Sequence, residues 1–299
     1  MNIGIVGNTS KPSALQIIEQ FTQVLEKHKV SCIYANDLID HLHLGPSSKT
    51  ATLSELGFLC SVVVSFGGDG TFLSTARDIG ASGTPILGVN VGTLGFLTEV
   101  VVHELEETVV ALIENRFSLS ERMVLHVKIG EADKESSFFA LNDVVLDRGS
   151  GSRLIDIDTQ VNGRFLNSYR ADGLIISTPT GSTAYSLSVG GPLVVPDLDA
   201  FIISPICPHS LNVRPIVLAK DSNITLSVRK EGEPVQINID GLNKYKMMSH
   251  EIMHITRADY NVRMISTGKR DFYKLLRKKL FWGAENNRDV STGEYSKGD

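Results

Sequence analysis

The chain has 299 residues, enough for about two domains at roughly 150 residues each. Apolar residues make up 42% of the chain and charged residues 21%, so burial can offset the entropy of ordering and a disordered chain is excluded. The formal net charge of −5 excludes a globally basic binder of nucleic acid or membranes, although local Lys, Arg and backbone N–H groups could still bind an anionic substrate.

The first hundred residues alternate short apolar runs with helical patterns. An apolar run at residues 3–6 predicts a strand, and apolar residues at helical spacing after Pro12 predict an amphipathic helix. The further predicted elements are strands at residues 30–34, 62–66 and 85–89 and a helix over residues 72–79. Residues 1–100 are therefore predicted to form an α/β domain with a parallel sheet and flanking helices.

The pattern changes after a predicted helix at residues 103–116. Runs rich in β-branched residues then alternate with Gly, Asn and Asp turns, which favours strands. The clearest runs lie at residues 124–129, 138–146 and 224–228. Residues 101–265 are therefore predicted to form a second, β-rich domain, so the predicted fold class is an α/β domain followed by a β-rich domain.

A basic amphipathic segment follows the β-rich part. Phe272, Leu275, Leu276 and Leu280 share one face of a predicted helix that also carries Lys and Arg, and Gly283 could cap it. A solvated basic face is favoured over contact with a polyanion. We expect residues 266–283 to pack back on the first domain and residues 284–299 to form a disordered tail.

The three cysteines, Cys32, Cys60 and Cys207, are scattered and form no Cys-x-x-Cys pair. The sequence therefore suggests neither a disulfide framework nor a thiolate zinc site, and a reducing compartment fits best. Residues 1–7 lack the features of a signal peptide, and no stretch approaches the roughly 18 apolar residues of a membrane span. We expect a cytoplasmic protein without a nucleic-acid or membrane partner.

A glycine cluster lies between the strand predicted at residues 62–66 and the helix that follows it. Gly67, Gly68 and Gly70 lack Cβ atoms, so consecutive N–H groups and the helix N-terminus could meet phosphate oxygens. The P-loop pattern is absent, and the third glycine of G-x-G-x-x-G would fall on Leu73. Asp69 would repel a phosphate here unless it takes part in the chemistry or meets a metal. The alternative is an aspartate that bonds its own turn, and this segment alone leaves both open.

A longer signature spans residues 172–192, where a predicted strand runs into a turn rich in hydroxyl groups. Thr180, Ser182 and Thr183 offer hydroxyls for helix capping or for a ligand, and Tyr185 offers a ring for stacking. Two glycines and a proline end the short helix at residues 190–192. The segment suits a nucleotide better than its alternative, a polar β-turn in a sheet-rich domain.

Together the two segments resemble the NAD kinase family, whose members phosphorylate NAD to NADP. The likeness extends from the first strand to about Gly283 and includes further short motifs, at residues 92–97, 142–143, 207–211 and 214–215. The Gly-Gly-Asp-Gly element is shared with diacylglycerol and sphingosine kinases and, more distantly, with phosphofructokinases. The Thr-Pro-Thr-Gly-Ser-Thr-Ala-Tyr-Ser run is far more specific to NAD kinases.

The resemblance implies a role for each matching residue. Asp69 would face the adenosine ribose 2′-hydroxyl of NAD and serve as catalytic base, while Gly67, Gly68 and Gly70 would bind phosphates. The implied contacts to NAD are Gly70 in the loop, Asn142 and Thr183 at the adenine, Asp143 at the ribose hydroxyls, Asp172 and Ser188 at the nicotinamide end, and Tyr185 and Ala184 as walls. Arg170 and His209 are further candidates, and a rim or core position is the alternative for His209.

Two positions depart from the family pattern. Asp143 stands where many relatives carry Glu, which keeps the carboxylate but shortens its reach. Val189 stands where relatives commonly carry Ala, and its added methyl groups could crowd the nicotinamide side.

The expected chemistry requires little covalent work from the protein, which must position the nucleophile and neutralise charge spreading over the γ-phosphate. Asp69 would orient the hydroxyl and accept its proton late, as the O–P bond forms. Charge neutralisation is expected from Mg²⁺ or another divalent cation that arrives with ATP, and the sequence shows no dedicated metal cage. By resemblance we expect NAD and ATP as substrates and a homodimer or homotetramer.

Three alternatives belong to other classes of protein. His250, Glu251 and His254 match the H-E-x-x-H zinc motif, but on a strand the two histidines would face away from the glutamate. A lipid kinase could share the glycine–aspartate loop, although no segment of residues 100–265 resembles a membrane-facing helix. A non-catalytic NAD-binding module would bind NAD without turnover, and Asp69 argues against it.

Overall fold

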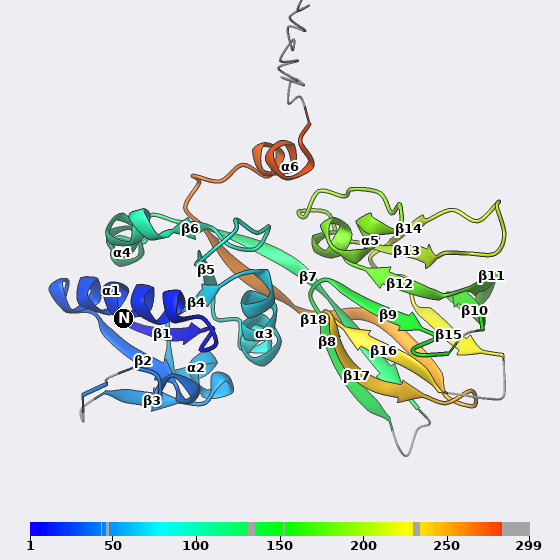
Figure 1. The fold of residues 1–299 in the computed structure, drawn as a ribbon, viewed down its shortest axis with the longest axis horizontal. Helices are drawn as coiled ribbons and strands as arrows, with labels where there is room; N and C mark the ends of the chain where they lie inside the picture. Colours follow the sequence, from blue (N-terminus) through cyan, green and yellow to red (C-terminus); the bar gives the residue numbers. More distant parts are fainter. Residues whose placement is uncertain (43, 46–47, 131–134, 152, 230–233, 283–299) are drawn as a thin grey trace, which may run out of the picture.

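The computed structural model describes residues 1–282 except 43, 46–47, 131–134, 152 and 230–233. Figure 1 shows an α/β part around the N-terminus and a β-rich part beside it, with the long strands β7 (Ser118–Ile129) and β18 (Ile252–Ser266) running between them. The predicted fold class is confirmed. Within the residues described, no helix combines the length and the apolar character needed to cross a membrane.

The α/β part is built on a parallel sheet in the order β5-β4-β1-β2-β3. Its strands are β1 (Asn2–Gly7), β2 (Ser31–Ala35), β3 (Lys49–Ala51), β4 (Val62–Gly67) and β5 (Ile86–Asn90), with the short β6 (Val100–Val101) on β5. The helices are α1 (Pro12–Lys27), α2 (Leu53–Leu59), α3 (Asp69–Ile79) and α4 (Leu105–Ile113). Short 3₁₀ turns lie at η1 (Asn36–Leu38), η2 (Gly80–Ser82) and η3 (Val102–Glu104).

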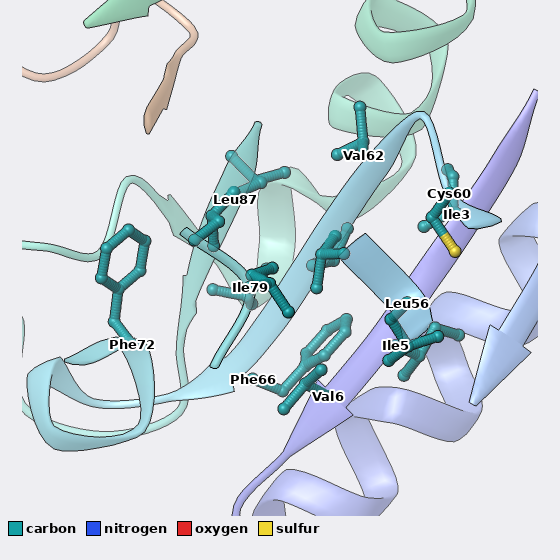
Figure 2. Packing of buried hydrophobic residues seen from close by; sticks show 14 of the residues in the cluster. Ile3, Ile5, Val6, Leu56, Cys60, Val62, Phe66, Phe72, Ile79 and Leu87 are labelled. Carbon is teal, nitrogen blue, oxygen red and sulfur yellow. The ribbon is translucent and has the colours of Figure 1, made fainter. Parts of the chain in front are cut away.

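Local sequence accounts for these elements. Pro12 occupies the first turn of α1, where its missing N–H is not needed, and the apolar stripe of that helix is buried against the sheet. Thr52 and Glu55 form a capping box at the start of α2. Figure 2 shows the resulting core, which extends from Ile3 on β1 to Phe72 on α3.

The β-rich part contains a second sheet and an extension of the first. The second sheet has the order β14-β13-β12-β9-β16-β17, and the extension runs β11-β10-β15-β18 with β7 and β8. The bounds are β7 (Ser118–Ile129), β8 (Ser136–Ala140), β9 (Asp143–Asp147), β10 (Ile155–Val161), β11 (Arg164–Ala171), β12 (Gly173–Ser177), β13 (Ala200–Ile206), β14 (Ile216–Ala219), β15 (Ile224–Val228), β16 (Val235–Ile239), β17 (Leu242–Met247) and β18 (Ile252–Ser266). Between β12 and β13 lie η4 (Thr180–Thr183) and α5 (Tyr185–Ser188).

The antiparallel pair β7 and β18 connects the two hydrophobic cores. Met123 belongs to the core of the β-rich part and the next residue, Val124, to the core of the α/β part. Successive residues of a strand point to opposite faces, so one strand supplies both cores. Met264 of β18 also pairs with Ile86 of β5, which joins the parallel sheet to the rest. The two parts are therefore linked by continuous backbone pairing.

Two sequence predictions need correction. The run at residues 138–146 is not one strand but two, because the ladder is interrupted at Leu141 and Asn142, whose N–H groups bond to Asp240 instead. The helix predicted at residues 103–116 is shorter, since α4 covers Leu105–Ile113 after a 3₁₀ turn.

The segment after β18 forms α6 (Phe272–Leu280), in which only Leu276 of the predicted apolar face is fully buried. Its contacts are with residues that follow β5: Arg270 bonds to Glu99 and Glu104, and the Phe272 ring lies 6.5 Å from the Phe96 ring. Division of the chain at residues 100 and 265 stays a prediction. The proposed cap Gly283 and the tail at residues 284–299 lie outside the described residues.

The packing of α1 can be tested with matched phenylalanine substitutions. Phe21 is fully buried and its ring lies 5.1 Å from that of Phe66 in an edge-on contact, whereas Phe58 is 80% exposed. We expect Phe21→Ala to lower the free energy of unfolding by about 3–5 kcal/mol. Phe58→Ala should change it by less than about 0.5 kcal/mol. Urea titration followed by circular dichroism measures both, and equal losses would contradict this account of the core.

Candidate active site

Asp69 is the first residue of α3, directly after the glycines that end β4. Its carboxylate does not bond its own turn. One oxygen accepts the backbone N–H of Phe96 and the other that of Leu97, both at 2.9 Å. The aspartate is thus held against a second loop, the Gly92 loop (residues 92–97).

The Gly92 loop is shaped to leave room for this carboxylate. A Cβ on Gly95 would lie 1.9 Å from an Asp69 oxygen, so any side chain there would force the carboxylate or the loop to move. Asn90 bonds the loop at Thr93 and Gly92, and Thr98 accepts the N–H of Gly95. The loop therefore presents its two N–H donors from a fixed backbone.

The three glycines beside Asp69 serve different purposes. A Cβ on Gly67 would lie 2.2 Å from Thr71 Oγ1, so packing inside the protein requires glycine there. A Cβ on Gly68 or Gly70 would meet nothing within 4 Å, and neither residue has a positive φ. Neither packing nor backbone conformation requires these two glycines, and both positions leave the backbone open to a ligand.

Asn142 and Asp143 lie at the interruption between β8 and β9. The Asp143 side chain is 4% exposed, and burial, together with the nearby negative charge of Asp240, raises the pKa of Asp143 to about 7. Asp240, at the turn after β16, accepts the N–H groups of Leu141, Asn142 and Asp143. A buried carboxylate is costly unless something compensates it, so Asp143 is a strong candidate for ligand contact.

The hydroxyl-rich turn packs directly on this interruption. Thr178 Oγ1 donates to the carbonyl of Leu141 at 2.6 Å and accepts the N–H of Gly181 at 3.1 Å. A Cβ on Gly181 would lie 2.1 Å from the carbonyl oxygen of Asn142, so only glycine permits the approach. The turn that carries Thr183 is thereby fixed against the Asn142 backbone.

The hydroxyls of this turn do not all face a ligand. Ser182 is fully buried and bonds to the backbone of Val194, so the prediction of a ligand-facing or capping Ser182 is wrong. Thr178, which the sequence did not single out, accepts the N–H of Gly181 in η4 instead. Thr180 is also buried, and Thr183 remains partly exposed with its hydroxyl on the Thr180 carbonyl.

The residues predicted for the nicotinamide end lie around Tyr185, which is 44% exposed. Partial burial and the charges of Asp147, Cys207, Asp172 and Asp143 raise the pKa of the Tyr185 phenol. Asp172 pairs with Arg148 at 2.7 Å, a partner that the sequence did not indicate. Ser188 and Ala184 belong to the same short segment as Tyr185.

His209 and Arg170 are joined through backbone, since the His209 N–H donates to the Arg170 carbonyl at 2.8 Å. Both side chains are exposed. A core position for His209 is therefore wrong.

A cleft of about 300 Å³ lies between the α/β part and the β-rich part. Phe96 and Leu97 line one side, and Thr180 and Thr183 line the other. The loop that holds Asp69 and the hydroxyl-rich turn thus face one space, although they are more than eighty residues apart in the sequence. Phe272, Tyr273 and Leu275, in the segment that follows β18, also line the cleft.

The local structure does not support a zinc site at His250, Glu251 and His254. H-E-x-x-H needs a helix, but Ile252–Ser266 is a strand. Glu251 accepts the Tyr245 hydroxyl and the Met248 N–H, while His254 Nδ1 pairs with Thr225. Among the residues that the structure describes, no group of three potential ligands could hold a metal ion.

Comparison with known proteins gives matches over most of the chain. Residues 3–117 match the model of the ATP-NAD kinase N-terminal domain, and residues 141–267 match that of the ATP-NAD kinase C-terminal domain. The NAD kinase of Geotalea daltonii is 40% identical over 283 residues, which are 94% of this chain and 98% of the relative. The NAD kinase of Bacteroides fragilis is 39% identical over 291 residues, 96% of this chain and 99% of the relative.

Two solved structures resemble this chain in fold. The yeast NADH kinase complexed with NADH superposes with a TM-score of 0.87 at 26% identity, covering 95% of this chain and 88% of that one. An Archaeoglobus fulgidus NAD kinase in complex with ATP shares the fold, with a TM-score of 0.74 at 24% identity over 94% of this chain and 99% of that one. This two-part fold, in which the Gly92 loop that bonds Asp69 lines the cleft between the parts, is that of a phosphotransferase that acts on an alcohol group. The chain belongs to the NAD kinase family.

The contact between Gly95 and Asp69 predicts a loss of activity. Gly95→Ala places a methyl group where the Asp69 carboxylate lies, so the carboxylate must leave its two N–H donors. We expect the rate of phosphoryl transfer to fall about 100-fold, as misplacement by about 1 Å costs in other enzymes. Gly45→Ala, at a position with nothing within 4 Å, is the matched control and should keep the wild-type rate. A coupled kinase assay measures both, and equal rates would contradict the argument.

The raised pKa of Asp143 predicts a stability that depends on pH. The folded protein retains a proton on this carboxyl up to about pH 7, whereas the unfolded chain loses it near an ordinary 3.8. The associated stability is complete below the lower value and is lost as the pH rises through the higher one. Asp143→Asn, which stays neutral, is expected to unfold about 2–4 °C above the wild type at about pH 8.

At about pH 5 the difference in midpoint should be smaller, because the folded wild type is then protonated. Differential scanning calorimetry of both proteins at the two pH values gives the comparison. A difference that does not depend on pH would show that Asp143 is ionised throughout.

Proposed function

We propose that this protein transfers the γ-phosphate of ATP to the 2′-hydroxyl of the adenosine ribose of NAD, giving NADP, with Asp69 as the general base. Its membership of the NAD kinase family supports the reaction. The observation that carries the role of Asp69 is its position: the carboxylate is fixed by two N–H donors of the Gly92 loop, whose Phe96 and Leu97 line the cleft.

The geometry leaves Asp69 able to accept a further hydrogen bond. Each carboxylate oxygen has about two acceptor sites and uses one of them for an N–H of the Gly92 loop. A ribose hydroxyl can therefore donate to the carboxylate without displacing either amide. The two amides hold the carboxylate still, so the hydroxyl oxygen is oriented toward the phosphorus atom.

The proton moves late in the reaction. A free carboxylate with a reference pKa of about 3.9 is too weak a base to ionise a sugar hydroxyl in the ground state. As the ribose oxygen bonds to the γ-phosphorus, the bond from phosphorus to the ADP oxygen breaks and ADP leaves with the electron pair. The hydroxyl proton passes to Asp69 at that stage and is later released to solvent.

NAD is proposed to lie across the cleft toward the β-rich part. Gly68 and Gly70 are the loop positions with space for a phosphate, while Gly67 supports the loop by its packing against Thr71. The remaining proposed contacts are Asn142 and Thr183 at the adenine, Asp143 at the ribose hydroxyls, Asp172 and Ser188 at the nicotinamide, Tyr185 and Ala184 as walls, and Arg170 and His209 at the rim.

Mg²⁺ or a similar cation is proposed to enter with ATP as part of the substrate, held mainly by its phosphates. The bound cation would neutralise negative charge that spreads over the transferred group. By the family resemblance we propose a homodimer or homotetramer. A cytoplasmic location is proposed from the three cysteines, which are free thiols in the structure.

The alternatives are less well supported. A lipid acceptor is not favoured, since the family models for NAD kinase match both parts of the chain. A non-catalytic NAD-binding module would leave unexplained why the Asp69 carboxylate is held by two backbone N–H groups beside the cleft.

The role of Asp69 is tested by Asp69→Asn. The amide keeps the size of the side chain but cannot accept a proton, so we expect NADP formation to fall by about 10²–10⁴-fold while NAD affinity stays within a few-fold. Asp37→Asn, an exposed aspartate on η1, is the control for a lost charge. NADP is detected with an NADP-specific dehydrogenase after incubation with NAD, ATP and Mg²⁺. A variant with normal turnover would remove Asp69 from the mechanism, and added diacylglycerol tests the lipid alternative.

A further inference from the structure

Asp240 makes several hydrogen bonds that have no part in the proposed mechanism. Its carboxylate accepts three consecutive backbone N–H groups, from Leu141 at 2.9 Å, Asn142 at 2.7 Å and Asp143 at 3.1 Å. Its own N–H donates to the Asp143 carbonyl at 3.0 Å. One side-chain carboxylate thus accepts three consecutive backbone N–H groups where β8 gives way to β9.

The turn that carries Asp240 places its side chain beside Asp143. Asp240 and Gly241 form the two-residue connection between β16 and β17, and both have positive φ, 49° and 76°. Two such residues make the tight hairpin turn that fits the twist of paired strands, and aspartate before glycine is among its preferred sequences. β16 is the neighbour of β9 in the sheet, so the turn lies directly beside Asp143.

We propose that Asp240 is the positioning residue of the NAD site, holding Asn142 and Asp143 in the orientation that receives the adenosine end of NAD. The inference rests on the proposed function, because it concerns the same acceptor site. Without the carboxylate, three adjacent N–H groups would lack their acceptor, and this stretch would depend on the bonds that its carbonyls accept from Thr178 and from the Asp240 N–H. Asp240 acts through these residues rather than by contact with the substrate.

Asp240 also faces the α/β part of the molecule. Arg77 of α3 borders the same small cavity as Asp240, together with Tyr260 of β18. The positive charge of Arg77 favours the ionised form of Asp240 and opposes the effect of burial, which raises the pKa of Asp240. Because α3 begins with Asp69, the helix that carries the base and the turn that orients the acceptor site lie against each other.

The same carboxylate affects the charge of Asp143. Besides each other, Asp143 and Asp240 interact with the charge of Arg77 on α3 and with the phenols of Tyr185 and Tyr260. The pKa of each phenol is raised, so both phenols are neutral at physiological pH. Burial and the charge of Asp240 together raise the pKa of Asp143 to about 7. An ionised Asp143 is the better acceptor for ribose hydroxyls, so NAD should bind less tightly as the pH falls below that value.

Asp240→Asn separates positioning from general stability. The amide has one acceptor oxygen instead of two, so at least one of the N–H groups loses its partner, and we expect Kd and KM for NAD to rise by about tenfold or more. kcat at saturating NAD should change less. Removal of the negative charge also lowers the pKa of Asp143, so the acid side of the NAD-binding profile moves to lower pH. A smaller fraction of folded protein would lower the number of NAD molecules bound per chain without moving this profile.

The chain offers a matched control. Asn162 and Gly163 form the same kind of turn between β10 and β11, with φ of 52° and 73°, and Asn162 Oδ1 accepts the Asn223 N–H. Asn162→Asp makes the reverse exchange of oxygen and nitrogen away from the site and should leave NAD binding and its pH profile unchanged. Calorimetric titration with NAD across pH, alongside steady-state kinetics, compares the two variants with the wild type.

A wild-type Kd and an unshifted pH profile in Asp240→Asn would overturn the proposal. Should this variant fail to fold, hydrogen exchange in the wild type decides: the N–H groups of Leu141, Asn142 and Asp143 should be protected, and rapid exchange would reject the role of Asp240. The proposed function and the positioning role of Asp240 can be rejected independently of each other. If the wild type binds NAD but makes no NADP, the proposed function fails, while the binding profile still tests Asp240.

Discussion

The arrangement of this molecule depends on carboxylates that accept consecutive backbone N–H groups. Asp69 accepts two from the Gly92 loop, and Asp240 accepts three from the chain between β8 and β9. Hydrogen bonds to charged acceptors are stronger than those between neutral groups, so each carboxylate can hold irregular backbone that no sheet supports. Both parts of the proposed site therefore contain backbone N–H groups that bond to an aspartate carboxylate.

The distance between these two parts is set by the strands that run from one to the other. β7 and β18 pair over most of their length and place side chains in both hydrophobic cores. α3 starts at Asp69 in one part and carries Arg77 toward Asp240 in the other. The cleft between Phe96 and Thr183 is consequently a product of the fold and not of flexible loops alone.

Much of the fold could be predicted because the apolar patterns are local. The stripe of α1 and the buried runs at β1, β4 and β15 are visible in the sequence, and the structure confirms them. The break at Leu141 could not be predicted from the run at residues 138–146, since its cause lies at Asp240, about a hundred residues away. Similarly, Gly95 shows no local reason to be glycine until the Asp69 carboxylate is seen beside it. The Asp-Gly pair at residue 240, which follows an alternating strand, was the one available signal for that residue.

The most direct test of this account is a crystal structure of the protein with NAD bound. The account predicts that the 2′-oxygen of the adenosine ribose lies at hydrogen-bonding distance, about 2.6–3.2 Å, from the Asp69 carboxylate. The same carboxylate should still accept the N–H groups of Phe96 and Leu97. A structure in which the carboxylate has turned away from the ribose, or in which the adenosine occupies a different surface, would contradict the account.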